Sequence, residues 1–176
     1  FGNADWEDYE LTLEALKTGG NEGFLVLFRV KNEKDFYWCN LGGWGNERHS
    51  LERGRSGESR WRAVGPSVDG GIESGRWYRI KVRCEGPHFR VWLDDQLLID
   101  FRDPDGHRRG MVGVGTWITQ AKFRNLRVTS LDGEVLYEGL PERLTRPSVA
   151  RHWEAFGPGE VFLENVDPLN SRFCQQ

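Results

Sequence analysis

Alternation of apolar and polar residues with a period of two is the feature that most restricts the fold of this chain. It is clearest in "YELTLEALK" (residues 9–17) and in "RWYRIKVRC" (residues 76–84). A strand with one face against a core has this period, whereas an amphipathic helix repeats every 3.6 residues. The residues expected to face inward are Tyr9, Leu11, Leu13, Ala15, Tyr78, Ile80, Val82 and Cys84.

Further strands and hairpins follow along the chain. "GFLVLFRV" (23–30) is continuously apolar, which predicts a central strand, and "KNEKD" turns it back into "FYWCNL" as a hairpin. "HFRVWLDDQLLIDF" (88–101) predicts a second hairpin with its tip at Asp94-Asp95-Gln96. With "GMVGVGTW", "AKFRNLRVTSL" and "EVLYEGL" we expect nine to eleven strands, no amphipathic helix, and an all-β antiparallel sandwich.

The character of the sequence changes near Gly139. "LPERLTRPSVARHW" carries two Pro and mixed charges, as a linker does, and the strand-like pieces after it are too short to bury themselves. We therefore expect a sandwich module over residues 1–139. Residues 140–176 are expected to be a linker and the leading edge of a further domain, or a tail that packs back on the sandwich. The absence of an initiating Met predicts an excised piece or a mature form.

Composition argues against several classes of partner and cofactor. Lys and Arg number 24 against 27 Asp and Glu, a net charge of −3, so we expect no nucleic acid and no anionic membrane surface as a partner. No apolar run approaches the roughly 18 residues of a membrane-spanning helix. Cys39, Cys84 and Cys174 predict neither a zinc site nor a disulfide framework, although one Cys39–Cys84 bridge is left open. We expect no cofactor, but Asp103 and Asp105 in a "DPDG" turn could hold a structural calcium ion.

The carboxylates give little support for catalysis. Glycoside hydrolysis needs two carboxyl groups that face one bond, about 5–5.5 Å or 6.5–9.5 Å apart. Glu47 and Glu52 in "ERHSLE" are five positions apart and are expected on opposite faces of a strand. We therefore predict no catalytic residues in this chain.

Residues 36–49, "FYWCNLGGWGNERH", combine aromatic and planar polar side chains with three glycines. Indole rings stack on the apolar faces of sugars, and Asn, Glu and Arg groups reach the hydroxyls. The candidate carbohydrate-binding residues are Arg29, Trp38, Asn40, Trp44, Asn46, Glu47, His49 and Trp61. The alternative is that the stretch is aromatic core. Trp77, Trp92 and Trp117 are expected to be packing residues in strands, and Arg79, Lys81 and Arg83 a solvated sheet face.

The quoted segments also resemble a known group of domains. "GFLVLFRV…FYWCNLGGWGN", "RWYRIKVRCEG…FRVWLDDQLL" and "GMVGVGTW…AKFRNLRV" resemble concanavalin A-like, laminin-G-like jelly-roll domains. "NLGGWGN" followed by "ERHSLE" is similar to the version in bacterial family 51 glycoside hydrolases, the α-L-arabinofuranosidases. The resemblance covers about residues 3–139, and the tail "GPGEVFLENVDPLNSRFCQQ" is similar to a segment bordering the catalytic part of those enzymes.

The resemblance implies an accessory sugar-binding module of a secreted or cell-surface enzyme, although no signal peptide is among these residues. Its implied partners are plant cell-wall polysaccharide, such as arabinoxylan, and the catalytic domain of the parent enzyme. Two alternatives remain open: a structural domain that packs on the catalytic barrel without binding sugar, and a glycosidase in its own right. A related group of jelly rolls that acts on oxidised disaccharides keeps the enzymatic alternative in consideration.

Overall fold

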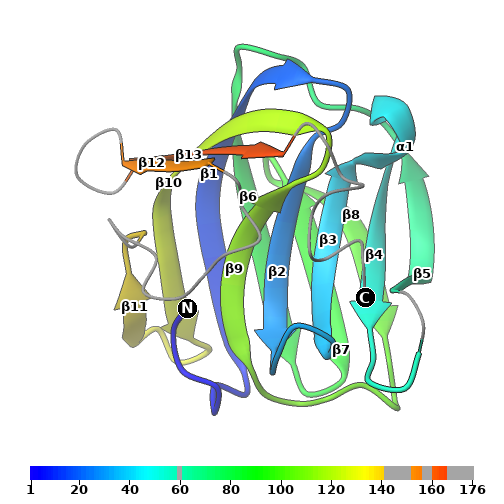
Figure 1. The fold of residues 1–176 in the computed structure, drawn as a ribbon. Helices are drawn as coiled ribbons and strands as arrows, with labels where there is room; N and C mark the ends of the chain where they lie inside the picture. The colour runs from blue at the N-terminus through cyan, green and yellow to red at the C-terminus, as the bar shows by residue number, and fades with distance from the viewer. Residues whose placement is uncertain (59–60, 141–151, 156–159, 166–176) are drawn as a thin grey trace.

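The chain folds into two antiparallel β-sheets packed face to face, as expected from the period of two (Figure 1). The computed structural model describes residues 1–58, 61–140, 152–155 and 160–165. The larger sheet has eight strands in the order β12-β13-β10-β1-β6-β7-β8, with β11 also paired to β10. Its strands are β1 (Tyr9–Gly20), β6 (Trp77–Glu85), β7 (His88–Leu93), β8 (Gln96–Arg102), β10 (Thr119–Ser130), β11 (Val135–Glu138), β12 (His152–Ala155) and β13 (Glu160–Asn165).

The smaller sheet has five strands in the order β5-β4-β3-β2-β9 and lies in front of the larger one in Figure 1. Its strands are β2 (Phe24–Val30), β3 (Phe36–Gly42), β4 (Arg48–Gly54), β5 (Arg62–Asp69) and β9 (Met111–Thr116). The expected central strand, β2, pairs with β3 on one side and β9 on the other. The described residues hold one short helical turn, α1 (Gly43–Asn46), and no helix there could cross a membrane.

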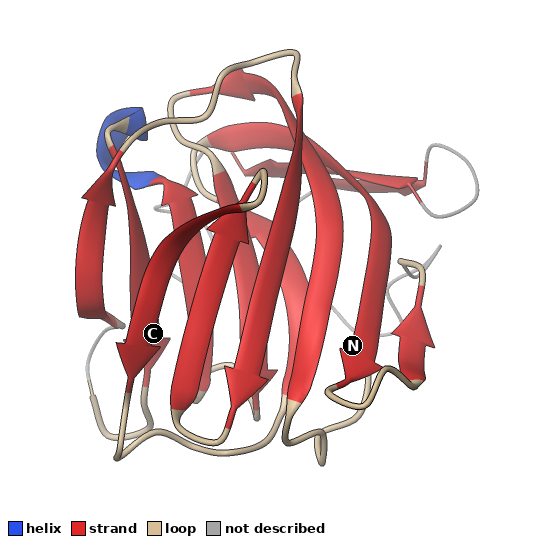
Figure 2. Ribbon diagram, turned by 180° about the vertical axis from the view of Figure 1, so that it is seen from behind, coloured by secondary structure: helices blue, strands red, loops and turns tan. Residues whose placement is uncertain are grey.

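The core lies between the sheets and is filled by the inward side of each alternating strand. All eight residues expected to face inward on β1 and β6 are buried. A buried aliphatic or aromatic side chain contributes about 1.5–3 kcal/mol through burial, so these strands cannot slip by one residue without large loss. Figure 2 views the molecule from the side of the eight-stranded sheet.

The predicted hairpin tip is a two-residue turn between β7 and β8. Asp94 and Asp95 both have positive φ, 48° and 68°, as a type I′ turn requires. Asp is one of the few residues that tolerates this conformation, because its short polar side chain can bond to nearby backbone. Here the Asp94 carboxylate accepts a hydrogen bond from the backbone N–H of Arg79, at 2.9 Å.

Three polar groups meet at one edge of the core. Asp103 Oδ2 accepts hydrogen bonds from Arg53 Nη1 at 2.6 Å and from the Tyr37 hydroxyl at 2.8 Å, and all three side chains are buried or nearly so. Asp103 therefore neutralises a buried cation. Among the described residues no three His, Cys, Asp or Glu side chains cluster to hold a metal ion.

Cys39 and Cys84 are both buried free thiols, so the bridge left open by the sequence is not formed. Cys174 lies outside the described residues. Within the expected tail, β13 pairs with β10 from Thr119↔Asn165 to Arg124↔Glu160, and β12 pairs with β13. This segment extends the eight-stranded sheet at the β10 edge (Figure 1).

Candidate functional site

The outer face of the five-stranded sheet carries a second aromatic cluster, separate from the core. Along β3 the side chains Phe36, Trp38 and Asn40 point outward, while Tyr37, Cys39 and Leu41 join the core between the sheets. This is the alternation expected from the sequence. The expectation of aromatic core holds for the inner face of the strand, and the outer face forms a separate cluster of Leu25, Phe36 and Trp38.

The aromatic rings of this face touch one another in a row. Phe36 lies 4.9 Å from Trp38, Trp38 lies 5.2 Å from Trp61, and Trp61 lies 5.6 Å from Trp117, measured between ring centroids. Tilted and edge-to-face contacts of this kind stabilise an aromatic cluster beyond the area it buries. Trp38 is only 3% exposed because its neighbours cover it, so it forms a floor rather than an open stacking platform.

A hollow of about 240 Å³ opens on this cluster. It combines four indoles with two carboxylates, one amide and one aliphatic side chain. Its lining residues are Glu22, Leu25, Trp38, Asn40, Trp44, Glu52, Trp61 and Trp117.

Trp44 is presented to this hollow by an unusual backbone. Trp44, Gly45 and Asn46 all have positive φ, 53°, 74° and 72°, so α1 is a run of left-handed residues and not a regular helix. A bulky residue in this conformation costs roughly 1–2 kcal/mol. The indole is nevertheless 44% exposed, so burial does not account for the strained backbone.

Contacts from the rest of the turn hold Trp44 in place. The Asn46 amide donates to the Ile72 carbonyl at 3.1 Å and accepts from the Ile72 N–H at 2.7 Å, which joins the turn to the loop before β6. His49 Nδ1 accepts the backbone N–H of Gly42 at 3.0 Å. Gly42 has φ 71°, and a Cβ there would lie 2.6 Å from the Asn46 amide oxygen, so only glycine fits.

Glu52 is the most buried polar group of the hollow, at 3% exposed. Its Oε1 accepts hydrogen bonds from Asn40 Nδ2 and from Ser50 Oγ, each at 3.1 Å. Burial raises the pKa of Glu52, and hydrogen bonds from Asn40, Trp38 and Ser50 only partly oppose the rise. Glu52 forms no ion pair with a described residue, so burial disfavours its charged form.

Glu22 is the second carboxylate and comes from the loop between β1 and β2. Its Oε1 accepts the backbone N–H of Gly45 at 3.2 Å, which ties it to the left-handed turn. Burial raises the pKa of Glu22 and the charge of Glu52 raises it further, while the N–H groups of Gly45 and Trp44 and the Lys17 ammonium lower it. The two carboxylates are therefore electrostatically coupled.

The structure brings together four of the eight predicted site residues: Trp38, Asn40, Trp44 and Trp61 line the hollow. Asn46 and His49 lie behind it and support the turn. Glu47, next to the turn, is exposed and lines no part of it.

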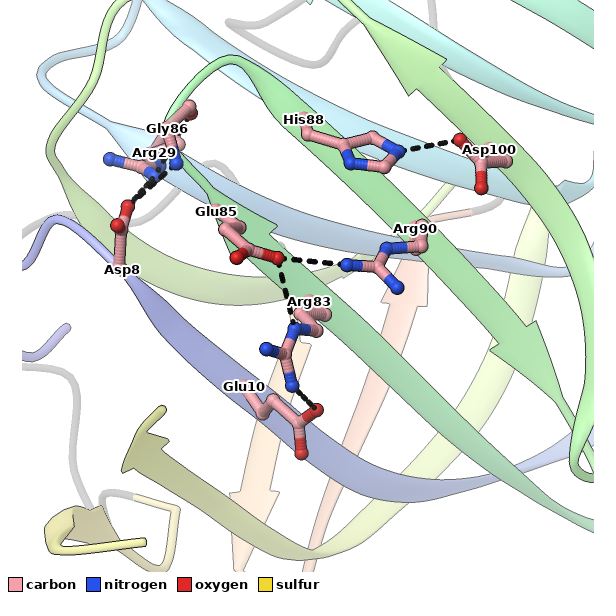
Figure 3. A network of polar contacts seen from close by, with 9 residues as sticks. All are labelled: Asp8, Glu10, Arg29, Arg83, Glu85, Gly86, His88, Arg90 and Asp100. Atoms are coloured by element: carbon pink, nitrogen blue, oxygen red, sulfur yellow. Dashed lines mark hydrogen bonds and ion pairs between the residues drawn. The ribbon is translucent and has the colours of Figure 1, made fainter. Parts of the chain in front are cut away.

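Arg29 lies on the other side of the five-stranded sheet. Its φ is 51°, at an irregularity where the pairing of β2 with β9 shifts, and its side chain is fully buried. There Nη2 lies 3.3 Å from Asp8 Oδ1 and 3.4 Å from the Gly86 carbonyl oxygen (Figure 3). The guanidinium also lies over the Tyr9 ring. The sequence placed Arg29 among the candidate carbohydrate-binding residues, but the irregularity turns its side chain inward and away from the hollow.

Sequence reasoning missed four residues of the hollow: Glu22, Leu25, Glu52 and Trp117. The prediction that Trp117 lies in a strand is wrong, because it lies in the connection between β9 and β10. The prediction that it is a packing residue holds, since it packs against the outer aromatic cluster, and it also lines the hollow. Because Trp117 directly follows "GMVGVGT", its position in a loop at the end of that strand could have been predicted from the sequence. Glu22 comes from a separate loop, and no local pattern connects it with β3.

The outer face of the eight-stranded sheet is of a different kind. Oppositely charged side chains pair across neighbouring strands, as Arg83 does with Glu10 at 3.0 Å and Arg90 with Glu85 at 2.8 Å (Figure 3). Lys81 lies 4.2 Å from the Trp92 ring centroid. The half-exposed, paired charges confirm the expectation of a solvated face at Arg79, Lys81 and Arg83.

Comparison with known proteins agrees with this architecture. The chain is 39% identical over 102 residues to an extracellular exo-α-L-arabinofuranosidase of Streptomyces chartreusis, and 28% identical over 108 residues to a levanase of Bacillus subtilis. These matches cover 58% and 61% of the chain but only 12% and 15% of the relatives. The resemblance to an arabinofuranosidase expected from the sequence is thus confirmed.

Solved structures show the same fold. A carbohydrate-binding module, CBM66, from Bacillus subtilis aligns with a TM-score of 0.62 at 23% identity, over 71% of this chain and 76% of that one. The galectin LEC-6 of Caenorhabditis elegans aligns with a TM-score of 0.50 at 12% identity, over 68% and 81%. The jelly-roll sandwich is therefore the fold of this chain. A family model described as a 3-keto-α-glucoside-1,2-lyase-like domain matches residues 1–129, and the chain belongs to this family.

Proposed function

We propose that this chain is a non-catalytic carbohydrate-binding module of a larger plant-polysaccharide-degrading glycoside hydrolase of the α-L-arabinofuranosidase type. The observation that carries the proposal is the hollow on the five-stranded sheet, where the exposed Trp44 indole shares a lining with a half-buried carboxylate, Glu22, and a buried one, Glu52. Such a surface offers an apolar wall for one face of a sugar ring and acceptors for its hydroxyls.

The contacts divide by chemistry. Trp44 and Trp117 provide ring faces at the rim, and Trp38 and Trp61 form the floor. Glu22 and Glu52 accept hydrogen bonds from hydroxyl groups, and the carbonyl oxygen of Asn40 adds an acceptor. The strained backbone of Trp44 supports the proposal, because strained residues persist only where the surrounding structure holds them, and they cluster at binding and active sites. Asn46 and His49 act as supports, and Arg29 and Glu47 are outside the proposed contact set.

For the whole protein we propose a module at residues 1–139, followed by residues 140–176 that border a catalytic domain. The relatives support this arrangement, because each is several times longer than its matching segment. The extracellular relative also supports a secreted or cell-surface location. The polysaccharides we favour are arabinose-decorated ones, with levan as a comparison because the second relative is named for it.

Tryptophan fluorescence titration with soluble arabinoxylan, arabinan and levan tests the proposal. We expect a saturable change for one of them in the wild-type chain and its loss in Trp44→Ala. The matched control is Trp92→Ala, which removes an indole from the outer face of the opposite sheet and should leave the titration intact. No binding of any of the three at millimolar sugar would contradict the proposal. In that case, acrylamide quenching of Trp44 in the longer protein would test whether this face packs against the catalytic domain.

A second candidate, catalysis in this chain, is favoured by two specific observations. The family description names a lyase, and Glu22 and Glu52 share one hollow and influence each other's ionisation. Turnover of aryl glycosides or of a 3-keto-α-glucoside by the isolated chain, abolished in Glu52→Gln and retained in Glu47→Gln, would establish it. Absence of turnover together with saturable binding would leave the binding module.

A further inference from the structure

The hollow is lined by acidic groups and by no basic group. Of its eight lining residues only Glu22 and Glu52 are ionisable, and both are acidic. Neither belongs to an ion pair among the residues described, in contrast to the paired carboxylates of Figure 3. A carboxylate buried without a cation is costly, and any ligand that brings a positive charge relieves that cost.

Two cations lie near the hollow, and neither forms an ion pair with Glu22 or Glu52 among the residues described. From β1, Lys17 acts on Glu22 but not on Glu52, and burial lowers its own pKa. From β4, Arg48 is exposed and its guanidinium lies 5.5 Å from the Trp44 ring centroid, at the rim. The indole walls add to the attraction, since the face of an indole ring attracts cations.

We propose that this site discriminates ligands by charge: it binds a sugar-like residue that bears a protonated amine more tightly than the neutral sugar, and it rejects the corresponding uronate. This inference rests on the proposed function for the place of the ligand and extends it to a ligand class, the cationic amino polyols. For a polysaccharide it predicts that neutral or amine-bearing units enter the hollow and that acidic side groups are excluded.

The test is calorimetric titration at neutral pH and low salt with the matched set galactosamine, galactose and galacturonate. A second pair is methyl α-L-arabinofuranoside and the protonated imino analogue of arabinofuranose. We expect the amine to bind at least about tenfold more tightly than its neutral counterpart, and the uronate at least about tenfold more weakly. Both ratios should shrink in high salt, because the hollow is open to solvent and its charges are screened.

Two variants separate a local charge effect from net charge. Glu52→Gln keeps the shape of the side chain and removes its charge, so the amine-to-neutral ratio should fall toward one whatever happens to the absolute affinities. Glu85→Gln removes the same unit of charge from the outer face of the other sheet and should leave the ratio unchanged.

Each outcome decides the charge discrimination, the carbohydrate-binding function, or both. Equal affinities across a matched set would overturn the charge discrimination and leave the carbohydrate-binding function intact. Binding of the amine alone, with no neutral sugar or polysaccharide bound, would overturn the proposed function and support the preference for cations. A ratio that falls equally in Glu52→Gln and Glu85→Gln would overturn the local assignment, and no binding of any ligand would overturn both.

Discussion

Replacing Trp44 by glycine and by alanine should reverse the usual stability order of these two residues. In regular structure Gly is less stable than Ala by roughly 0.5–1 kcal/mol, because it loses more conformational freedom on folding. At Trp44 the φ of 53° lies in the left-handed region, where a residue with a Cβ loses roughly 1–2 kcal/mol and Gly does not. The difference predicts that Trp44→Gly is the more stable variant by about 0.5–1 kcal/mol.

Thermal and urea unfolding of the two variants measure this difference. For a chain of this length about 1 kcal/mol corresponds to roughly 2–4 °C in Tm, which is within the precision of either assay. The matched control is Trp92 in β7. The pairing of β7 with β8 shifts register beside it, but its φ is not in the left-handed region, so Ala should be more stable than Gly there. Both Trp44 variants lose the same indole and should lose sugar binding equally.

An Ala variant at position 44 that equals or exceeds the Gly variant would refute the reasoning. It would mean that the turn relaxes out of the left-handed region once the indole is gone. The two hydrogen bonds between the Asn46 amide and the Ile72 backbone would then not be enough to hold the turn in this conformation. A further Asn46→Ala substitution should abolish the preference for Gly at position 44, because it removes both hydrogen bonds to the Ile72 backbone.

Two further predictions concern buried charge. Asp103→Ala leaves the Arg53 guanidinium buried without its partner and should lower the free energy of unfolding by roughly 3–5 kcal/mol. Urea denaturation measures this loss, and a value under about 1 kcal/mol would contradict the role given to this pair. Because burial raises the pKa of Glu52, the stability that its protonated form contributes is present at acid pH and is lost as the pH rises through the folded-state pKa. Glu52→Gln should therefore gain stability relative to wild type as the pH rises from acid to neutral, and a difference that stays flat with pH would count against the raised pKa.

Much of the fold follows from local patterns in the sequence. The alternation in β1 and β6, the apolar run of β2 and the Asp94-Asp95 turn were each predictable, because side-chain direction in a strand and the geometry of a two-residue turn depend on neighbouring residues. The expected nine to eleven strands compare with thirteen in the described residues. "EVLYEGL" predicted β11, whereas the four residues of β12 are too few for a clear period.

The candidate site was predicted mainly where it lies within the stretch at 36–49, and Trp61 is the one predicted lining residue from outside that stretch. Trp38, Asn40 and Trp44 come from the aromatic stretch itself, and period two correctly placed Trp38 and Asn40 on one face. Glu22 and Trp117 come from loops that are distant in sequence, and only the pairing of β3 with β2 and β4, and of β2 with β9, brings those loops to the same hollow.

By itself the sequence determined the class of the fold, because a period of two leaves few ways to bury one face of so many strands other than a sandwich. It also predicted that the stretch at 36–49 contributes to the candidate site, where Trp38, Asn40 and Trp44 line the hollow. The tertiary structure alone decided which of those side chains meet, because Arg29 turns inward at a bulge while the left-handed turn sends Trp44 outward. It also decided the charge of the site, since the burial of Glu52 away from any described cation depends on long-range packing and not on its neighbours in the chain.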